Sequence, residues 1–193
     1  MSDKELVRCC QADSAAFEEL VRRYRRAVFA YARTSTGSHQ DAEEVTQDVF
    51  VKIYRAAHRF NSKYSFTTWL YKITSNTCKN KLRGHRHPAA SLDDEDSPVV
   101  PVSQDAGPLE VYRKNIAAAE VRDAIAQLPV KYRQVLHLRY VDGLSYREIA
   151  DVLGLSLGNV EARIFRGKER VRLALLRHGE QADGSESRQP GGL

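Results

Sequence analysis

The sequence predicts an all-α protein built of two small helical domains that an extended linker joins. Apolar residues recur at three- and four-residue steps in both halves of the chain, and no run alternates as a strand would. Four of the six prolines lie between residues 88 and 108. With 193 residues, the chain divides into a first domain (1–87), a linker (88–114), a second domain (115–178) and a disordered tail (179–193).

Three helices are expected in the first domain. The first follows Asp13, a plausible N-cap, and the second follows the Gly37 break, where Ser38 and Asp41 have capping-box spacing. The third begins after Ser65 and runs to residue 82. Their apolar positions include Phe17, Leu20, Val21, Tyr24, Val28 and Tyr31, then Val45, Val49, Ile53 and Ala57, and finally Leu70 and Ile73.

In the second domain, helices are expected near 115–127, 130–141, 145–153 and 156–176. The last two have the spacing of a helix-turn-helix motif. Ser145 and Glu148 form a capping box, Ala150 provides a small residue at the helix crossing, and Gly154 lies at the turn. Val160 and Ile164, four residues apart, would hold the second helix on the first.

The second helix of such a motif enters the DNA major groove. Ser156 is the expected cap of this helix. The positions off its buried stripe are Asn159, Glu161, Ala162, Arg163 and Arg166, and its C-terminal half adds Lys168, Arg170 and Arg172 for phosphate contacts. A plain helical hairpin with a basic face is the simpler alternative.

Residues 58–72 mix aromatic and basic side chains. Phe60, Tyr64, Phe66 and Trp69 could stack on unpaired bases, which a protein that opens DNA strands requires. The alternative is that these aromatic rings belong to the core of the first domain.

The net charge of +5 is unevenly distributed. Residues 1–90 carry +7 and residues 112–178 carry +6, whereas residues 91–111 contain six acidic residues and no Lys or Arg. This pattern suggests two units that contact a polyanion. Without a long apolar run, a signal peptide or a disulfide framework in its three cysteines, we expect a cytoplasmic protein with no membrane insertion.

Taken together, three segments resemble an extracytoplasmic-function (ECF) sigma factor of the sigma-70 family: DAEEVTQDVFVKIYRA (41–56), FNSKYSFTTWLYKITSNTCKNKLR (60–83) and residues 128–172. The resemblance implies that the first domain is sigma region 2 and the second is the helix-turn-helix of region 4. Such a factor binds core RNA polymerase through the β′ clamp helices and the β flap, reads the −35 element as duplex and the −10 element as a melted strand of promoter DNA, and is usually restrained by an anti-sigma factor. No cofactor is implied.

The resemblance also assigns roles to residues of the first domain. The polymerase-docking helix would present Asp41, Glu44, Gln47 and Asp48, an acidic face suited to a basic partner. The loop that captures a flipped −10 base would present Asn61, Ser62, Lys63 and Tyr64. Trp69, Tyr71 and Lys72 fall in the melting region, and Lys79, Asn80 and Arg83 lie beside the edge of the −10 duplex.

The recognition helix departs from the family pattern, a Gly-Thr-Val-(Lys/Arg)-Ser-Arg run. Glu161 stands where relatives carry a basic residue, and Ala162 stands where they carry serine. A carboxylate can accept from cytosine N4, and alanine can contact only a thymine methyl. We therefore expect a −35 element that differs from the common GGAAC-like sequence.

Two other classes of protein are weaker interpretations. A stand-alone helix-turn-helix regulator would explain residues 144–172 and leave residues 41–83 without a role. An enzyme or metalloprotein would depend on Cys9, Cys10, Cys78, His85 and His87, which form no C-x-x-C or H-E-x-x-H motif. We expect no catalytic residue and no metal site.

Overall fold

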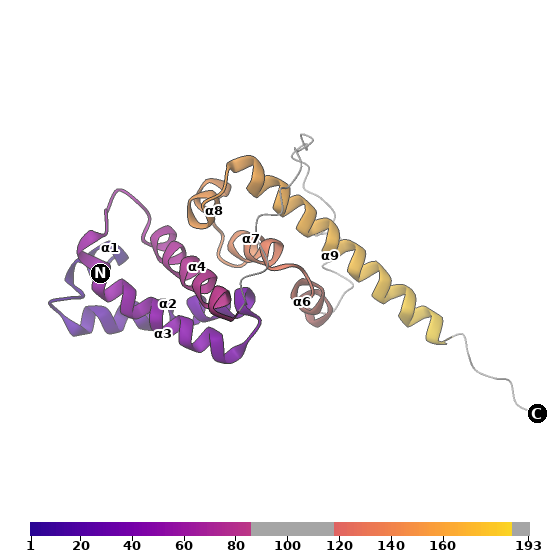
Figure 1. Cartoon of the computed structure of the whole chain (residues 1–193), viewed down its shortest axis with the longest axis horizontal. Coiled ribbons are helices and arrows are strands. Elements are labelled where there is room, and N and C mark those ends of the chain that lie inside the picture. Colours follow the sequence, from indigo (N-terminus) through magenta and orange to yellow (C-terminus); the bar gives the residue numbers. More distant parts are fainter. Residues whose placement is uncertain (86–117, 187–193) are drawn as a thin grey trace, which may run out of the picture.

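A computed structural model describes residues 1–85 and 118–186 of the chain (Figure 1). The described residues are helical, with no strand among them, which confirms the all-α prediction. Most of the predicted linker (88–114) and the end of the predicted tail (187–193) lie outside these residues. No helix in the described part is long and apolar enough to cross a membrane.

The first domain contains α1 (Asp3–Cys9), α2 (Ser14–Thr36), α3 (His39–Ala56), the short 3-10 helix η1 (Ala57–Arg59) and α4 (Phe66–His85). The predicted boundaries follow from the caps. The side chain of Asp13 accepts from the backbone N–H of Ala15 (2.9 Å), and that of Ser38 accepts from Asp41 (3.3 Å). Gly37 ends α2 at φ 77°, a left-handed conformation that favours glycine.

The prediction misses α1. This helix is short, but Ser2 and Glu5 form a capping box at its start, and Leu6 and Val7 are buried in the core. The Asp3 carboxylate ties it to α2 by accepting from Arg23 Nη1 (2.9 Å).

The core of the first domain is formed by the predicted apolar stripes of α2 and α3. Leu20, Val28 and Tyr31 on α2 are completely buried, and so are Val49 and Ile53 on α3. Full burial of each such side chain is worth about 1.5–3 kcal/mol relative to exposure, so this stripe stabilises the domain by itself.

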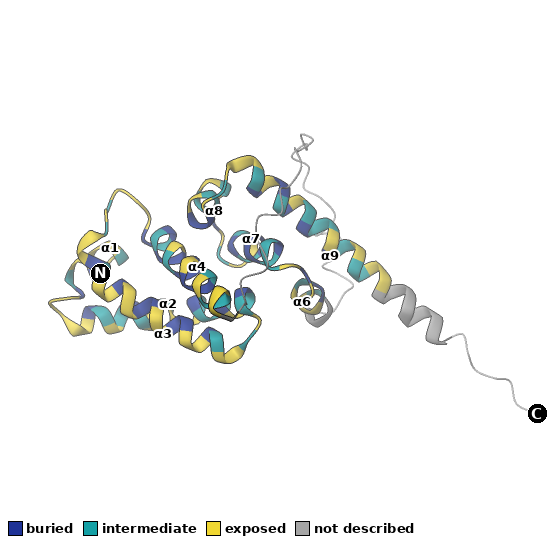
Figure 2. Ribbon diagram, viewed as in Figure 1, coloured by how far each residue is buried: buried dark blue, intermediate teal, exposed yellow. Residues whose placement is uncertain are grey.

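The second domain contains α6 (Ala118–Ala126), α7 (Val130–Tyr140), α8 (Tyr146–Leu153) and α9 (Leu157–Glu186). Its core includes Leu138 and Ile149, both fully buried, and Val160 and Ile164 from α9. Along α9, buried and exposed residues alternate as the helix turns (Figure 2).

α9 continues to Glu186, past residue 178, where the predicted disordered tail begins. The helix therefore includes residues 179–186 of the predicted tail. Gly179 and Gly184 cost about 1 kcal/mol each relative to alanine but do not block a helix, and the residues between them, Glu-Gln-Ala-Asp, are compatible with one.

The two domains pack against each other, with α7 on α2 and α8 on α4 (Figure 1). Polar groups contribute to this contact: Gln134 Nε2 donates to Ser35 Oγ (3.2 Å), and Thr68 Oγ1 donates to Glu148 Oε1 (3.3 Å). Such a polar contact resembles a transient protein–protein interface more than the inside of a domain.

The capping box of α8 gives a first testable prediction. Ser145 Oγ accepts from Glu148 N (3.3 Å), and Glu148 Oε2 accepts from Ser145 N (2.8 Å), which lowers the pKa of the Glu148 carboxyl. We expect Ser145→Ala to lower the unfolding free energy by about 1 kcal/mol in urea titrations followed by circular dichroism.

Because the pKa of Glu148 is lower in the folded state, the contribution of its carboxylate to the unfolding free energy is present above pH 4.5 and is lost as the pH falls below that value.

The control is Arg147→Ala, which replaces an exposed residue of the same helix and should leave the urea midpoint nearly unchanged. Equal stability of the Ser145 variant and the wild type would mean that the cap contributes nothing to this fold.

Candidate nucleic-acid interface

The helix-turn-helix prediction is confirmed by the geometry of α8 and α9. α8 begins at the Ser145 cap and ends at Gly154, whose φ of 70° lies in the left-handed region. The N–H of Gly154 then bonds to Ala150 O (2.9 Å), which closes the last turn of α8. Ser156 Oγ accepts from Asn159 N (3.3 Å) and starts α9. The buried side chains of Val160 and Ile164 hold α9 on the rest of the domain.

The exposed side of α9 differs from the predicted reading face in two residues, Ala162 and Phe165. Ala162 is only 5% exposed, which leaves little of its methyl group for the expected contact with a thymine methyl. Glu161 is exposed. The prediction misses Phe165, which is 45% exposed one turn after Glu161 and therefore lies on the same side of the helix. In the sequence, Phe165 directly follows the buried Ile164, so it cannot be told from the buried stripe by residue type.

The basic residues of α9 are partly held by other side chains. Arg163 Nε donates to Asn159 Oδ1 (2.9 Å), and both residues are half-buried. Arg166 and Lys168 are also half-buried. Arg170 is exposed, and its guanidinium lies 5.0 Å from the centroid of the Tyr132 ring. These side chains form a basic flank beside the exposed residues at the start of the helix.

α4 carries a second polar strip. Lys72, Asn80 and Arg83 are exposed as predicted, and their spacing places them on one side of the helix together with Asn76. Asn76 is exposed and was missed, although its i+4 spacing from Lys72 and i−4 spacing from Asn80 is the signal that would have identified it.

Two predicted residues of α4 do not belong to this strip. Tyr71 is 2% exposed and lies between the domains, beside Tyr31 on α2 and near the Asp142 carboxylate. Lys79 Nζ donates to the backbone oxygen of Leu153 at the end of α8 (3.0 Å). Both residues lie where the second domain contacts α4.

The loop between η1 and α4 combines a fixed aromatic base with exposed polar residues. Phe66 is buried, and Phe60 and Trp69 pack beside it with ring centroids 6.0 Å from that of Phe66. These three rings therefore belong mainly to the domain core, as the alternative interpretation had it. Tyr64, by contrast, is 64% exposed and is the ring that is free to stack on a base.

Local hydrogen bonds shape the same loop. Asn61 Oδ1 accepts from Lys63 N (3.0 Å), and Asn61 O accepts from Tyr64 N (3.1 Å), an Asx turn that leaves Lys63 and Tyr64 exposed. Ser62 is held from α1: its backbone oxygen accepts from Lys4 Nζ (2.6 Å), and its hydroxyl accepts from Arg8 Nη2 (3.0 Å).

α3 presents the predicted acidic face. Glu44, Gln47 and Asp48 are exposed, and Asp41 is half-buried. Lys81 Nζ lies 3.5 Å from Asp41 Oδ1 and also contacts the Glu44 carboxylate, so that it lowers the pKa of Glu44. The structure brings the four predicted docking residues together on one helix and links two of them to α4.

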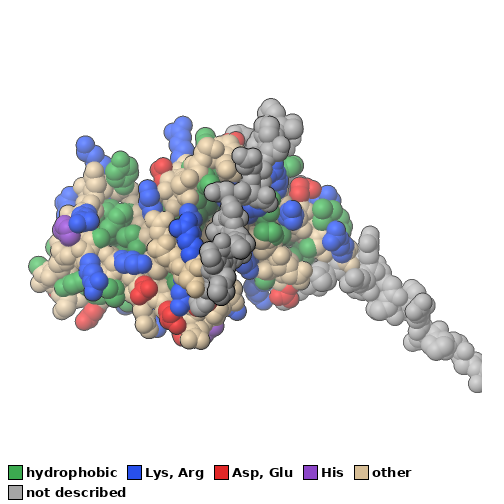
Figure 3. All heavy atoms as spheres, viewed as in Figure 1, with side chains coloured by type: hydrophobic (Ala, Val, Ile, Leu, Met, Phe, Trp, Pro, Cys, Tyr) green, Lys and Arg blue, Asp and Glu red, His purple; other side chains and the backbone are tan. Residues whose placement is uncertain are grey.

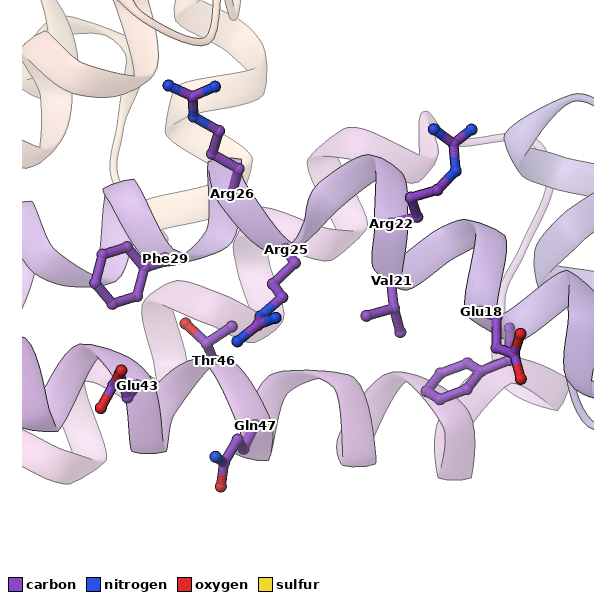
Figure 4. A pocket seen from close by; sticks show the side chains of 10 residues that line it. Glu18, Val21, Arg22, Arg25, Arg26, Phe29, Glu43, Thr46 and Gln47 are labelled. Atoms are coloured by element: carbon purple, nitrogen blue, oxygen red, sulfur yellow. The ribbon is translucent and has the colours of Figure 1, made fainter.

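Beside this face, α2 and α3 enclose a groove of about 830 Å³ (Figure 4). Phe17, Val21 and Phe29 supply its apolar lining, and Gln47 lies at its α3 edge. Arg25 extends from α2 toward Thr46 and Gln47, whereas Arg26 points to the other side of α2. The groove therefore joins the predicted docking face to an apolar surface.

On the face of the molecule that Figure 3 shows, Lys and Arg side chains are spread over both domains. In the described part of the chain, no group of three His, Cys, Asp or Glu side chains could hold a metal ion. Burial raises the pKa of the Cys78 thiol to about 12, which disfavours the thiolate that metal binding requires. His87 and the side chain of His85 lie outside the described residues.

Comparisons with known proteins agree with these features. The family model of sigma-70 region 2 matches residues 20–87, and that of sigma-70 region 4 matches residues 118–171. The RNA polymerase sigma-H factor of Pseudomonas aeruginosa is 36% identical over 180 residues, which cover 90% of this chain and 93% of that protein. The ECF RNA polymerase sigma-E factor of Haemophilus influenzae is 34% identical over 178 residues, covering 89% and 94%.

Two solved structures have a similar arrangement of helices. CnrH, solved in complex with the cytosolic domain of CnrY, superposes with a TM-score of 0.64 at 27% identity and covers 90% of this chain and 96% of that one. The sigma factor RpoE from Bartonella quintana, solved in complex with the anti-sigma factor NepR, superposes with a TM-score of 0.63 at 20% identity, covering 82% and 96%. The second likeness concerns the fold alone.

Proposed function

The chain belongs to the extracytoplasmic-function group of the sigma-70 family, and we propose that it binds core RNA polymerase and directs it to promoters through residues on both domains. The observation that carries this proposal is the presence, in one chain, of a helix-turn-helix with an exposed recognition helix and a region 2 domain with an acidic helix and an exposed polar loop. A stand-alone regulator would need only the first of these. The relatives of this chain are sigma factors, which are not enzymes, and we propose that the chain has a non-catalytic role in the cytoplasm.

In this proposal each surface has one task. The acidic face of α3 (Asp41, Glu44, Gln47 and Asp48) and the adjoining groove dock the clamp helices of the β′ subunit, and region 4 docks the β flap. The polar strip of α4 lies along the −10 duplex edge, and Tyr64 stacks on a base that has left the helix. The exposed side of α9 reads the −35 duplex in the major groove.

We also propose that an anti-sigma factor restrains this protein. The support is indirect: CnrH and the Bartonella RpoE were each solved with a partner, the cytosolic domain of CnrY and the anti-sigma factor NepR respectively.

Run-off transcription tests the proposed function directly. Purified core polymerase is combined with this protein on a pool of genomic fragments, and start sites are read by sequencing. We expect discrete new starts that share upstream −35 and −10 motifs. An absence of new starts with folded protein and active core polymerase would favour the stand-alone regulator, which footprints its operator without polymerase.

Asp48→Arg tests the docking face. The side chain is exposed on α3, so the fold should be retained, while the reversed charge should repel a basic coiled coil and reduce co-purification with core polymerase at least tenfold. Lys52→Glu, which also reverses charge on an exposed residue of α3, serves as the comparison. Normal co-purification of the Asp48 variant would place the docking surface elsewhere.

Glu161→Ala tests the reading face of α9. If the carboxylate accepts from cytosine N4, the variant should lose about 1–3 kcal/mol of base discrimination at one −35 position while retaining or gaining general affinity, because a charge that repels phosphate is removed. Selection of randomised −35 duplexes by the holoenzyme measures this. Arg170→Ala is the matched control, and it should weaken binding to all sequences alike. Unchanged preference in the Glu161 variant would remove Glu161 from the reading face.

A further inference from the structure

The helix α1 lies beside the region 2 loop, which is the segment 60–65 between η1 and α4 (Figure 1). Lys4 Nζ donates to the backbone oxygen of Ser62 (2.6 Å), and Arg8 Nη2 donates to the hydroxyl of the same residue (3.0 Å). Lys4 and Arg8 are four residues apart, so both side chains lie on one side of α1. Two cations of one helix therefore meet on a single residue of the loop.

The helix α1 is itself fixed by contacts that do not involve this loop. Leu6 and Val7 are buried in the core of the domain. The Asp3 carboxylate accepts from Arg23 Nη1 (2.9 Å) and from the Tyr24 hydroxyl (2.5 Å), both on α2. Burial and the bond to Asp3 raise the pKa of Tyr24 to about 12, so this hydroxyl keeps at neutral pH the proton that it donates. α1 can therefore serve as a fixed base for the loop.

The middle of the loop, residues 61–64, is otherwise held by its own hydrogen bonds. Asn61 accepts two of them, from Lys63 N and from Tyr64 N. Among the described residues, the hydrogen bonds that reach this segment from another element both come from α1, and both end on Ser62. Ser62 is half-buried, whereas Asn61, Lys63 and Tyr64 are exposed. The middle of the loop is therefore attached to the rest of the domain through Ser62.

The two bonds to Ser62 restrict different groups. The bond from Lys4 fixes the carbonyl of the peptide that joins Ser62 to Lys63, and the bond from Arg8 fixes the Ser62 side chain. Both donors are positively charged, and charge-assisted hydrogen bonds are stronger than neutral ones. Each bond alone contributes little, because both cations are exposed, but together they hold one residue by its backbone and by its side chain.

A loop that is held in this way can capture a base at a lower cost. Extrusion of a base from duplex DNA already costs free energy, and a loop that had to become ordered at the same step would add to that cost. A loop that is already ordered, with the Tyr64 ring 64% exposed, avoids the addition.

We propose that Lys4 and Arg8 are positioning residues, through which α1 holds the region 2 loop in the shape that receives an extruded base of the −10 element. Neither side chain needs to touch DNA in this role. That the loop captures a base rests on the proposed function; that α1 holds the loop does not.

The first experiment measures backbone order by NMR in the full chain, without polymerase or DNA. Arg8→Ala should lower the order parameters of the Lys63 and Tyr64 amides from about 0.85, typical of a rigid backbone, toward about 0.6, typical of a flexible one. The matched control is Arg122→Ala, which removes an exposed arginine from α6 and should leave both values unchanged. Wild-type order parameters in the Arg8 variant would overturn the proposal.

Ser62→Ala separates the two bonds. It removes the hydroxyl that accepts from Arg8 and leaves the carbonyl that accepts from Lys4. In the Ser62→Ala background, we therefore expect Arg8→Ala to have no further effect on the order parameters, whereas Lys4→Met should still lower them. An Arg8→Ala effect of the same size with and without the Ser62 hydroxyl would refute the positioning role.

The same variant decides the question if Arg8→Ala loosens α1 as a whole. Ser62→Ala leaves every residue of α1 in place, so the amides of α1 should keep their wild-type order while those of Lys63 and Tyr64 become more mobile. An unchanged loop in the Ser62 variant would overturn the proposal.

Binding of the −10 strand tests what the held loop does. The holoenzyme is titrated with non-template-strand oligonucleotides from a promoter that run-off transcription identifies, each lacking one base. For the wild type and for Arg122→Ala, removal of the captured base should raise Kd about tenfold, because its stacking is lost. In Arg8→Ala this penalty should shrink several-fold, because a mobile loop holds the base poorly. An equal loss of affinity for intact and abasic strands would mean that Arg8 contacts a phosphate, which would overturn the positioning role.

The two measurements separate this proposal from the proposed function. If no holoenzyme binds these oligonucleotides, the wild type included, the proposed function fails and the capture of a base fails with it, while the order parameters still decide whether α1 holds the loop. Binding by the wild type with an unchanged abasic penalty in the Arg8 variant would overturn the positioning role and leave the proposed function intact.

Discussion

Because α8 lies against α4, hydrogen bonds join the two domains that are proposed to read the two promoter elements. DNA does not offer its two elements so close together, so this one contact constrains how the molecule can act. The 27 residues of the predicted linker span at most about 90 Å when extended, which is comparable with the distance between the elements. Length alone therefore permits both a closed and an open arrangement, and the interdomain contact selects the closed one.

Apolar residues stabilise each domain, and aromatic and polar residues form the contact between the domains. Within the domains, side chains such as Ile53, Leu138 and Ile149 are fully buried and stabilise each helical unit independently of the other. Between the domains, tyrosines, a histidine and a carboxylate take their place. If the domains separate, the polar groups of the contact can be solvated by water while the apolar core of each domain stays buried.

Much of the fold could be predicted from the sequence, since each helix begins and ends at local signals. Caps at Asp13, Ser38 and Ser145 and the left-handed glycines at Gly37 and Gly154 locate helix ends without reference to distant residues. The prediction missed α1 because a helix of seven residues shows too little periodicity to be recognised. This helix is held instead by contacts with distant residues, such as that of Asp3 with Arg23.

The candidate site was less predictable, because the exposure of a side chain depends on which other helix packs on its face. Periodicity left Ala162 open to DNA, but the packing of α9 turns it inward and leaves Phe165 outside. Tyr71 and Lys79 have polar groups suited to DNA, but α8 covers them. The placement of one domain on the other involves residues more than one hundred positions apart, such as Thr34 and His137, and no local pattern encodes such a pairing.

If the domains must separate before both promoter elements are read, the contact between them lowers the promoter affinity of the free chain. If only a fraction of molecules is open, the apparent affinity for a promoter falls by that fraction. A closed form favoured by about 3 kcal/mol would weaken binding about 150-fold. A partner that holds the open form removes this penalty, so core polymerase could increase promoter affinity by separating the domains even where it touches no base. Promoter specificity would then reside in α9 and the region 2 loop, while the contact of α8 with α4 would determine when both are used.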